Sequence, residues 1–379
     1  MTDPQRVPVV VVGAGAAGLA VAAQLARRDV PAVVLERDAR VGQRWAERYD
    51  RLHLHTHRLL SGMPDRRIPR SASHYVSKDV YAEYLAGYAR DLELDVRLQA
   101  EVSSIERVGS RWRVFASTGD FDAEAVVLAT GRYDVPQLPS WPDAGSLGKR
   151  LVHASHYRSG AAYSGQRVLV VGIGNSGAEI AADLVEQGAA GVAISVRTVP
   201  PISPRDIAGV PSQLLGIALA ALPPRLADVI NAGFRRLGPN LSRWGLDRPG
   251  WRTFSAVRPP VIDVGFLAQL RRGAIDVRPA LDRFEDGDAV FADGARERFD
   301  AVVAATGSKP GIAALLASVP GVLDGHGLPL GPGADGLHFL GFGPTLRGQL
   351  LEIRRGAPRV ASRVARELRE MEQACGQQE

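Results

Sequence analysis

The chain has 379 residues, of which 45% are hydrophobic and 23% charged, so its composition excludes a disordered protein and predicts two domains or one large domain with an insertion. The formal net charge of +5 comes from arginines that are scattered among acids, which argues against a nucleic-acid-binding protein. Cys375 is the only cysteine, which excludes an internal disulfide and a Cys-x-x-Cys redox pair and suits a reducing cytoplasm.

The chain opens with the pattern of a dinucleotide-binding unit. The apolar run Val9–Val12 predicts a buried parallel strand, and the glycine-rich turn Gly13-Ala-Gly15-Ala-Ala-Gly18 follows it. An Ala- and Leu-rich helix and a second apolar run, Ala32–Leu35, lead to the acid Glu36. Such glycines let a pyrophosphate approach the helix N-terminus, and the acid accepts hydrogen bonds from a ribose. This unit therefore predicts a site for a nucleotide with a free 2′-hydroxyl group.

Three histidines, His53, His55 and His57, stand at alternate positions in RLHLHTHRLL. Alternate residues of an extended strand share a face, so the three imidazoles have a spacing that suits a zinc or copper ion. Few carboxylate or cysteine side chains are nearby to complete such a site. We therefore expect no metal at these histidines.

A second unit of the same kind begins at Val168–Val171. Its glycines, Gly172, Gly174 and Gly177, repeat the spacing of the first turn. Glu36 lies 23 positions after Gly13, and Ser195 lies the same 23 positions after Gly172, with Arg197 two residues later. A missing carboxylate and a nearby arginine favour a 2′-phosphate, which predicts NADP at the second unit. The alternative for Arg197 is a solvated arginine at the end of a strand.

Each unit has its own buried strand that ends in Ala-Thr-Gly. AVVLATGRY (Ala125–Tyr133) matches AVVAATGSK (Ala301–Lys309). In both, the glycine lets the backbone leave the strand tightly beside a nucleotide. The chain order predicts that the second unit is inserted into the first domain, with residues 1–158 and 299–379 in the first domain and 159–298 in the second. Residues 203–257 lack a strand pattern and predict a helical, loop-rich segment.

The most apolar run, Leu214–Leu226, is too short to cross a bilayer, and Pro223-Pro224 interrupt it. We expect a core or interface helix here, with a membrane-surface or substrate-channel helix as the lesser alternative. The N-terminal residues are polar and lead directly into a strand, so no signal peptide is expected. These features predict a cytoplasmic protein without an integral membrane segment.

Several longer stretches share one resemblance. They are ERDARVGQRWAERYDRLHLHTHRLLSGMP after the first acid, HASHYRSG before the second unit, GQRVLVVGIGNSGAEIAADL within it, RPPVIDVGFLAQLRRGAIDV, and GLHFLGFGPTLRGQLLEIRRGA near the C-terminus. With them the chain resembles the flavin-containing monooxygenases, most of all the plant YUCCA-type branch and its bacterial relatives. The resemblance implies an α/β fold of two Rossmann-like domains, in which an NADPH-binding domain is inserted into an FAD-binding domain.

The resemblance also implies the cofactor-binding residues. For FAD they are Gly13, Gly15, Gly18, Glu36, Arg44, Trp45 and His55, and for NADPH they are Gly172, Gly174, Asn175, Ser176, Gly177 and Arg197. A further set is assigned to cofactor binding as a whole: Ala16, Ala17, Arg37, Val102, Ala129, Thr130, Gly131, Thr306, Gly307 and Leu350.

The chemistry implied by the resemblance is monooxygenation. NADPH passes hydride to FAD, the reduced flavin adds O2 to form a C4a-(hydro)peroxyflavin, and one oxygen atom enters a small organic substrate. The acceptor is a soft nitrogen or sulfur atom, or a carbonyl group, as in the α-keto acids that YUCCA-type enzymes decarboxylate. The alternative function is a flavin-dependent NADPH oxidase or dehydrogenase without substrate oxygenation. Neither substrate identity nor oligomeric state follows from the sequence.

This chain departs from the family pattern at named positions. In the family motif F-x-G-x-x-x-H, Leu147 stands at the phenylalanine and Lys149 at the glycine, while His153 is kept. Ser308 stands where tyrosine is common after the second Ala-Thr-Gly. Aligning Arg58 with the basic residue of the family places His55 where many members have an active-site asparagine. We therefore interpret His55 as the candidate catalytic residue.

Overall fold

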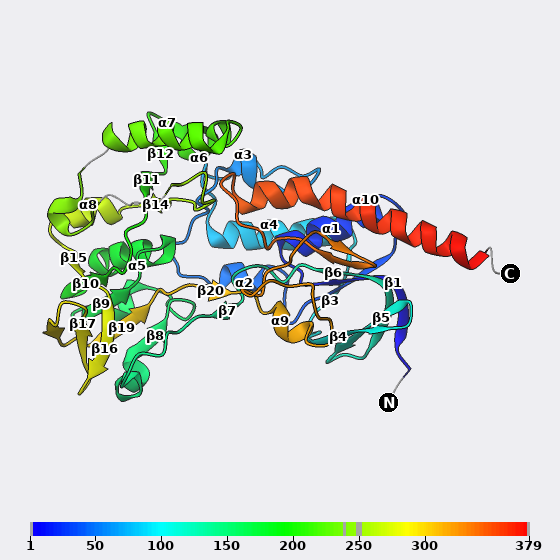
Figure 1. Ribbon diagram of the computed structural model, residues 1–379, viewed down its shortest axis with the longest axis horizontal. Coiled ribbons are helices and arrows are strands. Elements are labelled where there is room, and N and C mark those ends of the chain that lie inside the picture. The colour runs from blue at the N-terminus through cyan, green and yellow to red at the C-terminus, as the bar shows by residue number, and fades with distance from the viewer. Residues whose placement is uncertain (1–2, 238–239, 248–251, 377–379) are drawn as a thin grey trace.

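The computed structural model describes residues 3–237, 240–247 and 252–376. Two sheets, built mainly from parallel strands, occupy different halves of the molecule (Figure 1). Each contains one glycine-rich turn, and the chain returns to the first sheet after it has completed the second. The predicted α/β fold with two Rossmann-like units, the second inserted into the first, is confirmed.

The first sheet has β1 near its centre. Its strand order is β21-β22-β6-β1-β2-β3, and the hairpin β4–β5 extends it from β6. β1 pairs in parallel with β2 and β6, and all four residues from Val9 to Val12 are buried. The strands are β1 (Gln5–Val12), β2 (Ala32–Leu35), β3 (Asp95–Arg97), β4 (Val102–Val108), β5 (Arg111–Ala116), β6 (Phe121–Leu128), β21 (Gly333–Ala334) and β22 (Leu337–Phe339).

Two long helices pack on this sheet. α1 (Ala16–Ala26) is buried from Ala16 to Leu25, because its alanines and glycine let it approach the strands closely. α10 (Gln349–Gly376) crosses over α1 and ends beside the C-terminus (Figure 1), and the side chain of Cys375 in its last turn lies outside the described residues. The remaining helices of this half are α2 (Gln43–Ala46), α3 (Arg58–Ser61), α4 (Lys78–Asp91) and α9 (Ile312–Leu315).

The second sheet has the order β15-β10-β9-β19-β8. α5, which follows the second glycine turn, and α8 lie on one side of it, and a three-stranded meander, β16–β17–β18, follows β15 (Figure 1). The elements are β8 (Leu151–His153), β9 (Arg167–Val171), α5 (Asn175–Glu186), β10 (Gly191–Ser195), α8 (Phe266–Arg271), β15 (Asp276–Arg278), β16 (Leu281–Glu285), β17 (Asp288–Phe291), β18 (Arg296–Glu297) and β19 (Ala301–Ala304), with short 3₁₀ helices at Ala144–Arg150 and Gly160–Tyr163.

The strand pairing places the unit boundaries elsewhere than expected. β8 and β19 both lie outside residues 159–298, yet they pair with each other in the second sheet. The expected boundaries therefore cut two strands from the second unit, because sequence patterns identify strands without showing which strands pair. Two connectors, β7 (Val135–Pro136) and β20 (Ser308–Lys309), form an antiparallel pair between the halves. We propose that the second unit runs from β8 to β19 and that β7 and β20 are its two connections.

The segment 203–257 contains the predicted helices α6 (Ser212–Leu219) and α7 (Pro224–Leu237) and a 3₁₀ turn at Ser242–Trp244. It also contains strands that the sequence did not indicate, since β12 (Asp206–Ile207) forms a hairpin with β13 (Val210–Pro211). At its start, β11 (Ile202–Pro204) pairs with β14 (Val261–Asp263), which lies beyond the segment. Leu214 and Leu226 are exposed, whereas Leu219 between them is buried in a small cluster with Ala227 and Phe254. Within the described residues, no helix is long and apolar enough to cross a membrane.

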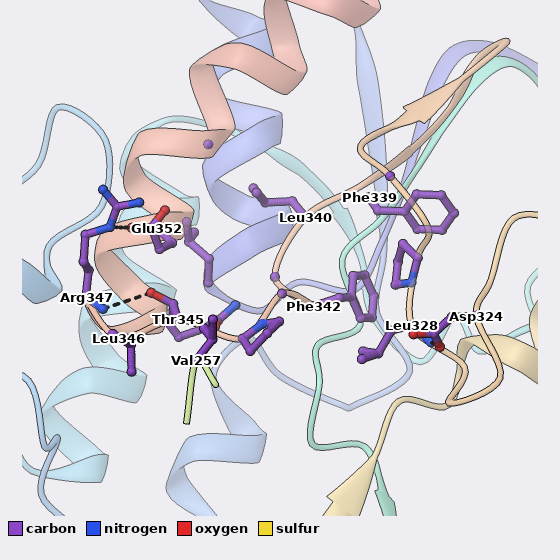
Figure 2. Close-up of a pocket in the computed structure, with 18 of the residues that line it drawn as sticks. Val257, Asp324, Leu328, Phe339, Leu340, Phe342, Thr345, Leu346, Arg347 and Glu352 are labelled. Atoms are coloured by element: carbon purple, nitrogen blue, oxygen red, sulfur yellow. Dashed lines mark hydrogen bonds and ion pairs between the residues drawn. The ribbon is translucent and has the colours of Figure 1, made fainter. Parts of the chain in front are cut away.

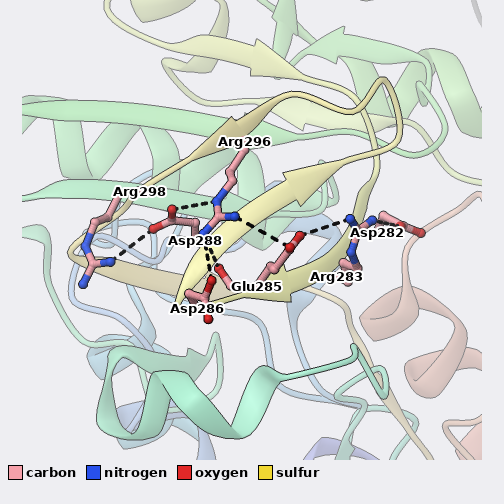
Figure 3. Close-up of polar contacts among 7 residues, drawn as sticks. All are labelled: Asp282, Arg283, Glu285, Asp286, Asp288, Arg296 and Arg298. Atoms are coloured by element: carbon pink, nitrogen blue, oxygen red, sulfur yellow. Dashed lines mark hydrogen bonds and ion pairs between the residues drawn. The ribbon is translucent and has the colours of Figure 1, made fainter.

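The meander shows how the arginines of this chain are neutralised (Figure 3). Arg296 lies among three carboxylates, with Nε 2.9 Å from Asp288 and further contacts to Glu285 and Asp286. Arg298 also contacts Asp288, at 3.2 Å. Exposed pairs of this kind contribute little to stability. Their effect is to balance positive charge locally, in line with the scattered acids of the sequence.

Gly18 and Gly15 make a matched pair for a test of stability. A Cβ on Gly18 would lie 1.8 Å from the carbonyl oxygen of Gly13, whereas a Cβ on Gly15 would meet nothing within 4 Å. We expect Gly18→Ala to lower the free energy of unfolding by about 3 kcal/mol. Gly15→Ala should cost about 1 kcal/mol or less. Urea unfolding of the two cofactor-free variants measures both, and equal losses would contradict the tight packing at Gly18.

Candidate active site

The first glycine turn has the shape of a pyrophosphate cradle. Gly13 has φ +102°, and Gly15 caps α1 without a side-chain hydrogen bond to the first turn of the helix. The space beside the Cα of Gly15 is open, and Ala16 and Ala17 begin the helix with small side chains. Backbone N–H groups and the positive end of the helix dipole therefore remain available to an anion. These features fit the phosphates of a dinucleotide.

Glu36 stands directly after β2, beside this turn. Its Oε2 accepts a hydrogen bond from the N–H of Ala14 at 2.6 Å, and its Oε1 accepts one from the N–H of Asp38 at 3.0 Å. Each carboxylate oxygen has a further lone pair, so both oxygens can still accept hydrogen bonds from ribose hydroxyl groups. The N–H of Ala100 donates to the carbonyl of Glu36 at 2.8 Å, which brings the start of β4 and Val102 alongside.

Arg37 and Arg44 converge on the same loop. Arg37 forms an ion pair with Asp134, and Nη2 of Arg44 lies 3.6 Å from the same carboxylate. Both arginines line a cavity of about 330 Å³ at the connection between the units. Trp45, the next residue, packs edge-on against Tyr81 with ring centroids 4.9 Å apart. Arg37, Arg44 and Trp45 thus lie on one side of the first unit, as expected for residues of one cofactor site.

A larger cavity of about 770 Å³ lies where β22 passes into α10. Figure 2 shows Phe339 and Phe342 on one side of it and Arg347 with Glu352 on the other, with Nε of Arg347 2.8 Å from Oε1 of Glu352. Its wall includes Gly341, where a Cβ would lie 3.2 Å from that of Ala17. The cavity therefore adjoins the N-terminus of α1. Leu350 does not line it but is buried in the core beside α1.

The second glycine turn repeats the geometry of the first. Gly172 has φ +106°, and a Cβ on Gly174 would meet nothing within 4 Å. Gly177 packs against the carbonyl of Gly172 as Gly18 does against Gly13. Asn175 begins α5, and its side-chain oxygen accepts a hydrogen bond from the N–H of Ile262 at 2.8 Å, which ties the turn to β14. This turn fits a second dinucleotide.

The strand register corrects the residue that replaces Glu36. Val12 pairs with Leu35 in the first unit, and Val171 pairs with Ser195 in the second. Ser195 thus corresponds to Leu35, because α5 has 12 residues and α1 has 11. The hydroxyl of Ser195 is used by the chain itself, since it donates to the carbonyl of Pro279 at 2.8 Å. The position of Glu36 is taken by Val196, which is buried and apolar.

Val196 in the place of Glu36 favours NADP at the second turn. Valine removes the carboxylate as serine would, and it offers no hydrogen bond to a ribose. Arg197, the next residue, corresponds to Arg37 and is exposed at the end of β10. An exposed guanidinium in this position suits a 2′-phosphate.

The two Ala-Thr-Gly segments adjoin the two turns. A Cβ on Gly13 would lie 3.0 Å from the carbonyl oxygen of Ala129, and one on Gly172 would lie 2.7 Å from that of Ala305. Gly131 and Gly307 both have φ +86°, as a tight exit from the strand requires. Among the neighbouring side chains, the hydroxyl of Thr130 is buried without a partner, and that of Thr306 donates to the carbonyl of Gln137.

His153, which keeps its place in the family motif, is bound to the second of these segments. Its Nε2 lies 3.0 Å from the carbonyl oxygen of Gly307, and its Nδ1 accepts a hydrogen bond from the N–H of Ser155 at 3.1 Å. Tyr157 is buried, and its hydroxyl donates to Asp183 of α5 at 2.6 Å. His153 therefore ties β8 to the second Ala-Thr-Gly segment, and Tyr157 ties the stretch after β8 to α5.

The three alternating histidines do not lie on one strand. The stretch turns, and His53 forms only an isolated bridge with Ser77. Nδ1 of His53 lies 2.9 Å from the carbonyl oxygen of Arg51, and His57 caps α3. His55 alone points to an acid, with Nε2 3.1 Å from Oε1 of Glu179. In the part of the chain that the structure describes, no group of three or more His, Cys, Asp or Glu side chains is arranged to hold a metal ion.

Glu179 and Tyr49 complete a buried polar cluster that the sequence analysis did not identify. Tyr49 donates its hydroxyl proton to Glu179 and accepts a hydrogen bond from Ser176. Burial raises the pKa of Glu179 to about 7, and burial together with Arg205 lowers the pKa of His55 to about 4. The signal in the sequence is a pair of acids, Glu179 and Asp183, one helical turn apart among the Ala, Ile and Leu residues of α5.

Arg197 is expected to decide the choice between NADPH and NADH. An arginine–phosphate contact contributes roughly 1.5–3 kcal/mol, which corresponds to about a 10- to 100-fold change in affinity. Arg197→Ala should raise the Michaelis constant for NADPH by that factor and leave that for NADH nearly unchanged. Arg272→Ala, at another exposed arginine of the second unit, is the control. Equal losses with both nucleotides would mean that Arg197 is structural.

The comparisons with known proteins agree with this geometry. The family model of the pyridine nucleotide-disulphide oxidoreductases matches residues 10–203. The chain is 34% identical to indole-3-pyruvate monooxygenase YUCCA4 of Oryza sativa subsp. japonica, over 88% of this chain and 82% of that protein. It is also 34% identical to the probable indole-3-pyruvate monooxygenase YUCCA1 of Arabidopsis thaliana, over 90% and 86%.

A solved structure extends the likeness to three dimensions. The flavin-containing monooxygenase from Stenotrophomonas maltophilia is 25% identical, with a TM-score of 0.74, over 95% of this chain and 98% of that one. The chain therefore belongs to the flavin-containing monooxygenases, a family of FAD- and NADPH-dependent oxidoreductases.

Proposed function

We propose that this protein inserts one oxygen atom from O2 into a small organic substrate, with NADPH as reductant and through a C4a-(hydro)peroxyflavin. FAD occupies the first turn, with Glu36 at its ribose, and NADPH occupies the second turn, with Arg197 at its 2′-phosphate. The bound cofactors supply hydride transfer and oxygen activation, and the chain supplies binding, orientation and a site that excludes water.

One observation carries this proposal: the first unit reaches the start of the helix that follows the second turn. Tyr49 and His55, from the first unit, contact Ser176 and Glu179 in the first two turns of α5. Arg51 adds an ion pair with Glu186, at 3.0 Å, farther along the same helix. Groups held at both turns thus meet across this contact, which supports direct transfer of hydride between them.

The protein's own groups have separate tasks in the proposed reaction. The backbone of the two glycine turns binds phosphates, and the Ala-Thr-Gly segments keep the backbone close to both nucleotides. His153 holds the second Ala-Thr-Gly segment in place, and Tyr157 holds the stretch after β8 against α5. His55 is the candidate that exchanges a proton at the reacting centre, because it is half-buried at the contact and its Nδ1 makes no hydrogen bond to any described residue.

The names of the rice and Arabidopsis relatives make indole-3-pyruvate the first substrate to test. A panel of α-keto acids, amines and thioethers, scored by NADPH consumption and by a mass increase of one oxygen atom in the product, distinguishes attack on a carbonyl from transfer to nitrogen or sulfur. We also propose a cytoplasmic location, which fractionation of the source cells tests.

Rapid mixing separates the proposed function from a plain NADPH oxidase. The purified protein is reduced with NADPH without oxygen and then mixed with O2. We expect an absorbing species to form before the oxidised flavin returns, and to decay faster when substrate is present. Direct return to oxidised flavin, with stoichiometric peroxide and no effect of any substrate, would favour the oxidase.

A further inference from the structure

A buried acid lies at the contact between the two nucleotide-binding units. Glu179 is 1% exposed and stands one turn into α5. Its Oε1 lies 3.1 Å from Nε2 of His55 but makes no hydrogen bond among the described residues, so the ring N–H has to turn toward it for a proton to pass, and Tyr49 donates a hydrogen bond to the same carboxyl group. An acid withdrawn from water in this way destabilises the fold unless its partners compensate. A hydrophobic residue of similar size would avoid this loss of stability, so we looked for a functional role of the acid.

His55 has one ring nitrogen on Glu179 and one without a partner. Nδ1 is buried and makes no hydrogen bond among the described residues. A neutral imidazole has one donor and one acceptor nitrogen, so a proton held on Nε2 makes Nδ1 an acceptor. An ionised Glu179 favours that arrangement. Nδ1 is then free to accept a proton from a bound molecule.

We propose that Glu179 is the proton partner of His55: through the imidazole, it takes up the O–H proton that a hydroperoxide bound at this contact loses when its outer oxygen attacks a substrate carbonyl. Nδ1 of His55 accepts that proton, and Nε2 passes its own proton to the carboxylate. The imidazole is neutral before and after, and the carboxylate becomes a neutral carboxyl group. The reverse transfer restores both groups after the product leaves. His55 is thus the catalytic residue, and Glu179 is a positioning residue that holds the proton.

The charges around the pair support this direction of transfer. Glu179 faces Tyr49 and Arg51 of the first unit, Arg205 after β11, and Asp183 of its own helix, while His55 faces Glu179 and Arg205. Burial raises the pKa of Glu179 to about 7, so the carboxylate is present above that pH and is lost as the pH falls. Because the pKa of His55 is lowered to about 4, the imidazole is neutral throughout this range.

The first test is a titration of the resting, FAD-loaded protein by nuclear magnetic resonance. Ring-labelled histidine reports His55, whose signal is assigned by its loss in His55→Ala. We expect a change of the His55 shifts with a midpoint near pH 7, without conversion to imidazolium. Glu179→Gln should abolish this step, and Tyr49→Phe should move it to higher pH because a hydrogen bond to the carboxylate is lost. An unchanged titration in Glu179→Gln would overturn the proposal.

The second test uses the rate of product formation against pH, and it rests on the proposed function of the site. The rate should rise through about pH 7, and Glu179→Gln should remove this limb and lower the rate on the order of 10²-fold. Glu179→Asp, which keeps a carboxyl group, should restore a rise of the rate with pH. Asp286→Asn, at an exposed acid of the β16–β17–β18 meander, should change neither.

The outcomes of the two tests distinguish a wrong role for Glu179 from a wrong proposed function. Glu179→Gln should keep its anaerobic reduction by NADPH, and loss of that step would show a structural role in nucleotide binding instead. If no variant or wild-type protein forms an oxygenated product, the proposed function is wrong, yet the titration of His55 still decides whether Glu179 holds its proton. If the rate of Glu179→Gln still rises through about pH 7, proton transfer from His55 to Glu179 is contradicted, even if oxygenation is confirmed.

Discussion

Gly15→Asp should yield a colourless protein. Gly15 caps α1 without a side-chain hydrogen bond, and the space beside its Cα is open. An aspartate there places a carboxylate where the flavin pyrophosphate approaches the N–H groups of the helix. Losing two charge-assisted hydrogen bonds costs roughly 3–6 kcal/mol, or about a 10²- to 10⁴-fold loss of affinity, before charge repulsion is counted. The flavin absorbance of the purified variant, relative to its protein absorbance, measures the result.

The backbone of the variant should remain intact. Gly15 has φ −77° and ψ −175°, which any residue adopts, so an aspartate at this position is not strained. Gly15→Ala is the control, and it should keep its flavin. A Gly15→Asp protein that purifies with a full complement of flavin would refute the assignment of the first turn.

Gly174→Asp should leave the flavin bound and weaken the binding of NADPH, because the second turn has the same geometry as the first. We expect this variant to be yellow, with its flavin reduced by NADPH on the order of 10²-fold more slowly at low nucleotide concentration. Reduction by dithionite, which needs no nucleotide site, should be normal. Anaerobic stopped-flow traces of flavin bleaching measure both rates. Loss of flavin in Gly174→Asp, or normal reduction by NADPH, would contradict the separation of the two sites.

Local patterns in the sequence predicted the two turns, because their chemistry depends on neighbouring residues. The run Ala32–Leu35 is the whole of β2, and Gly13, Gly15 and Gly18 occupy the turn that their spacing implies. Strand partners depend instead on residues far apart. β8 and β19 therefore fell outside the predicted second unit, and only the register showed that Val196, one residue beyond Ser195, replaces Glu36.

The candidate site could be predicted only in part, again because contacts between distant residues leave no local pattern in the sequence. His55 was singled out, but on a strand that does not form, because the stretch turns after His53. The sequence analysis did not identify Glu179, although a buried acid one turn after a glycine-rich turn is unusual. Its contact with His55 joins residues 124 positions apart, and no local pattern encodes such a contact.

The most direct test of the proposed oxygenation is a single turnover in ¹⁸O2 with a substrate that the panel identifies. The product should gain one ¹⁸O atom for each NADPH consumed, with little peroxide released. A product free of label, with peroxide equal to the NADPH consumed, would contradict monooxygenation and leave an NADPH oxidase.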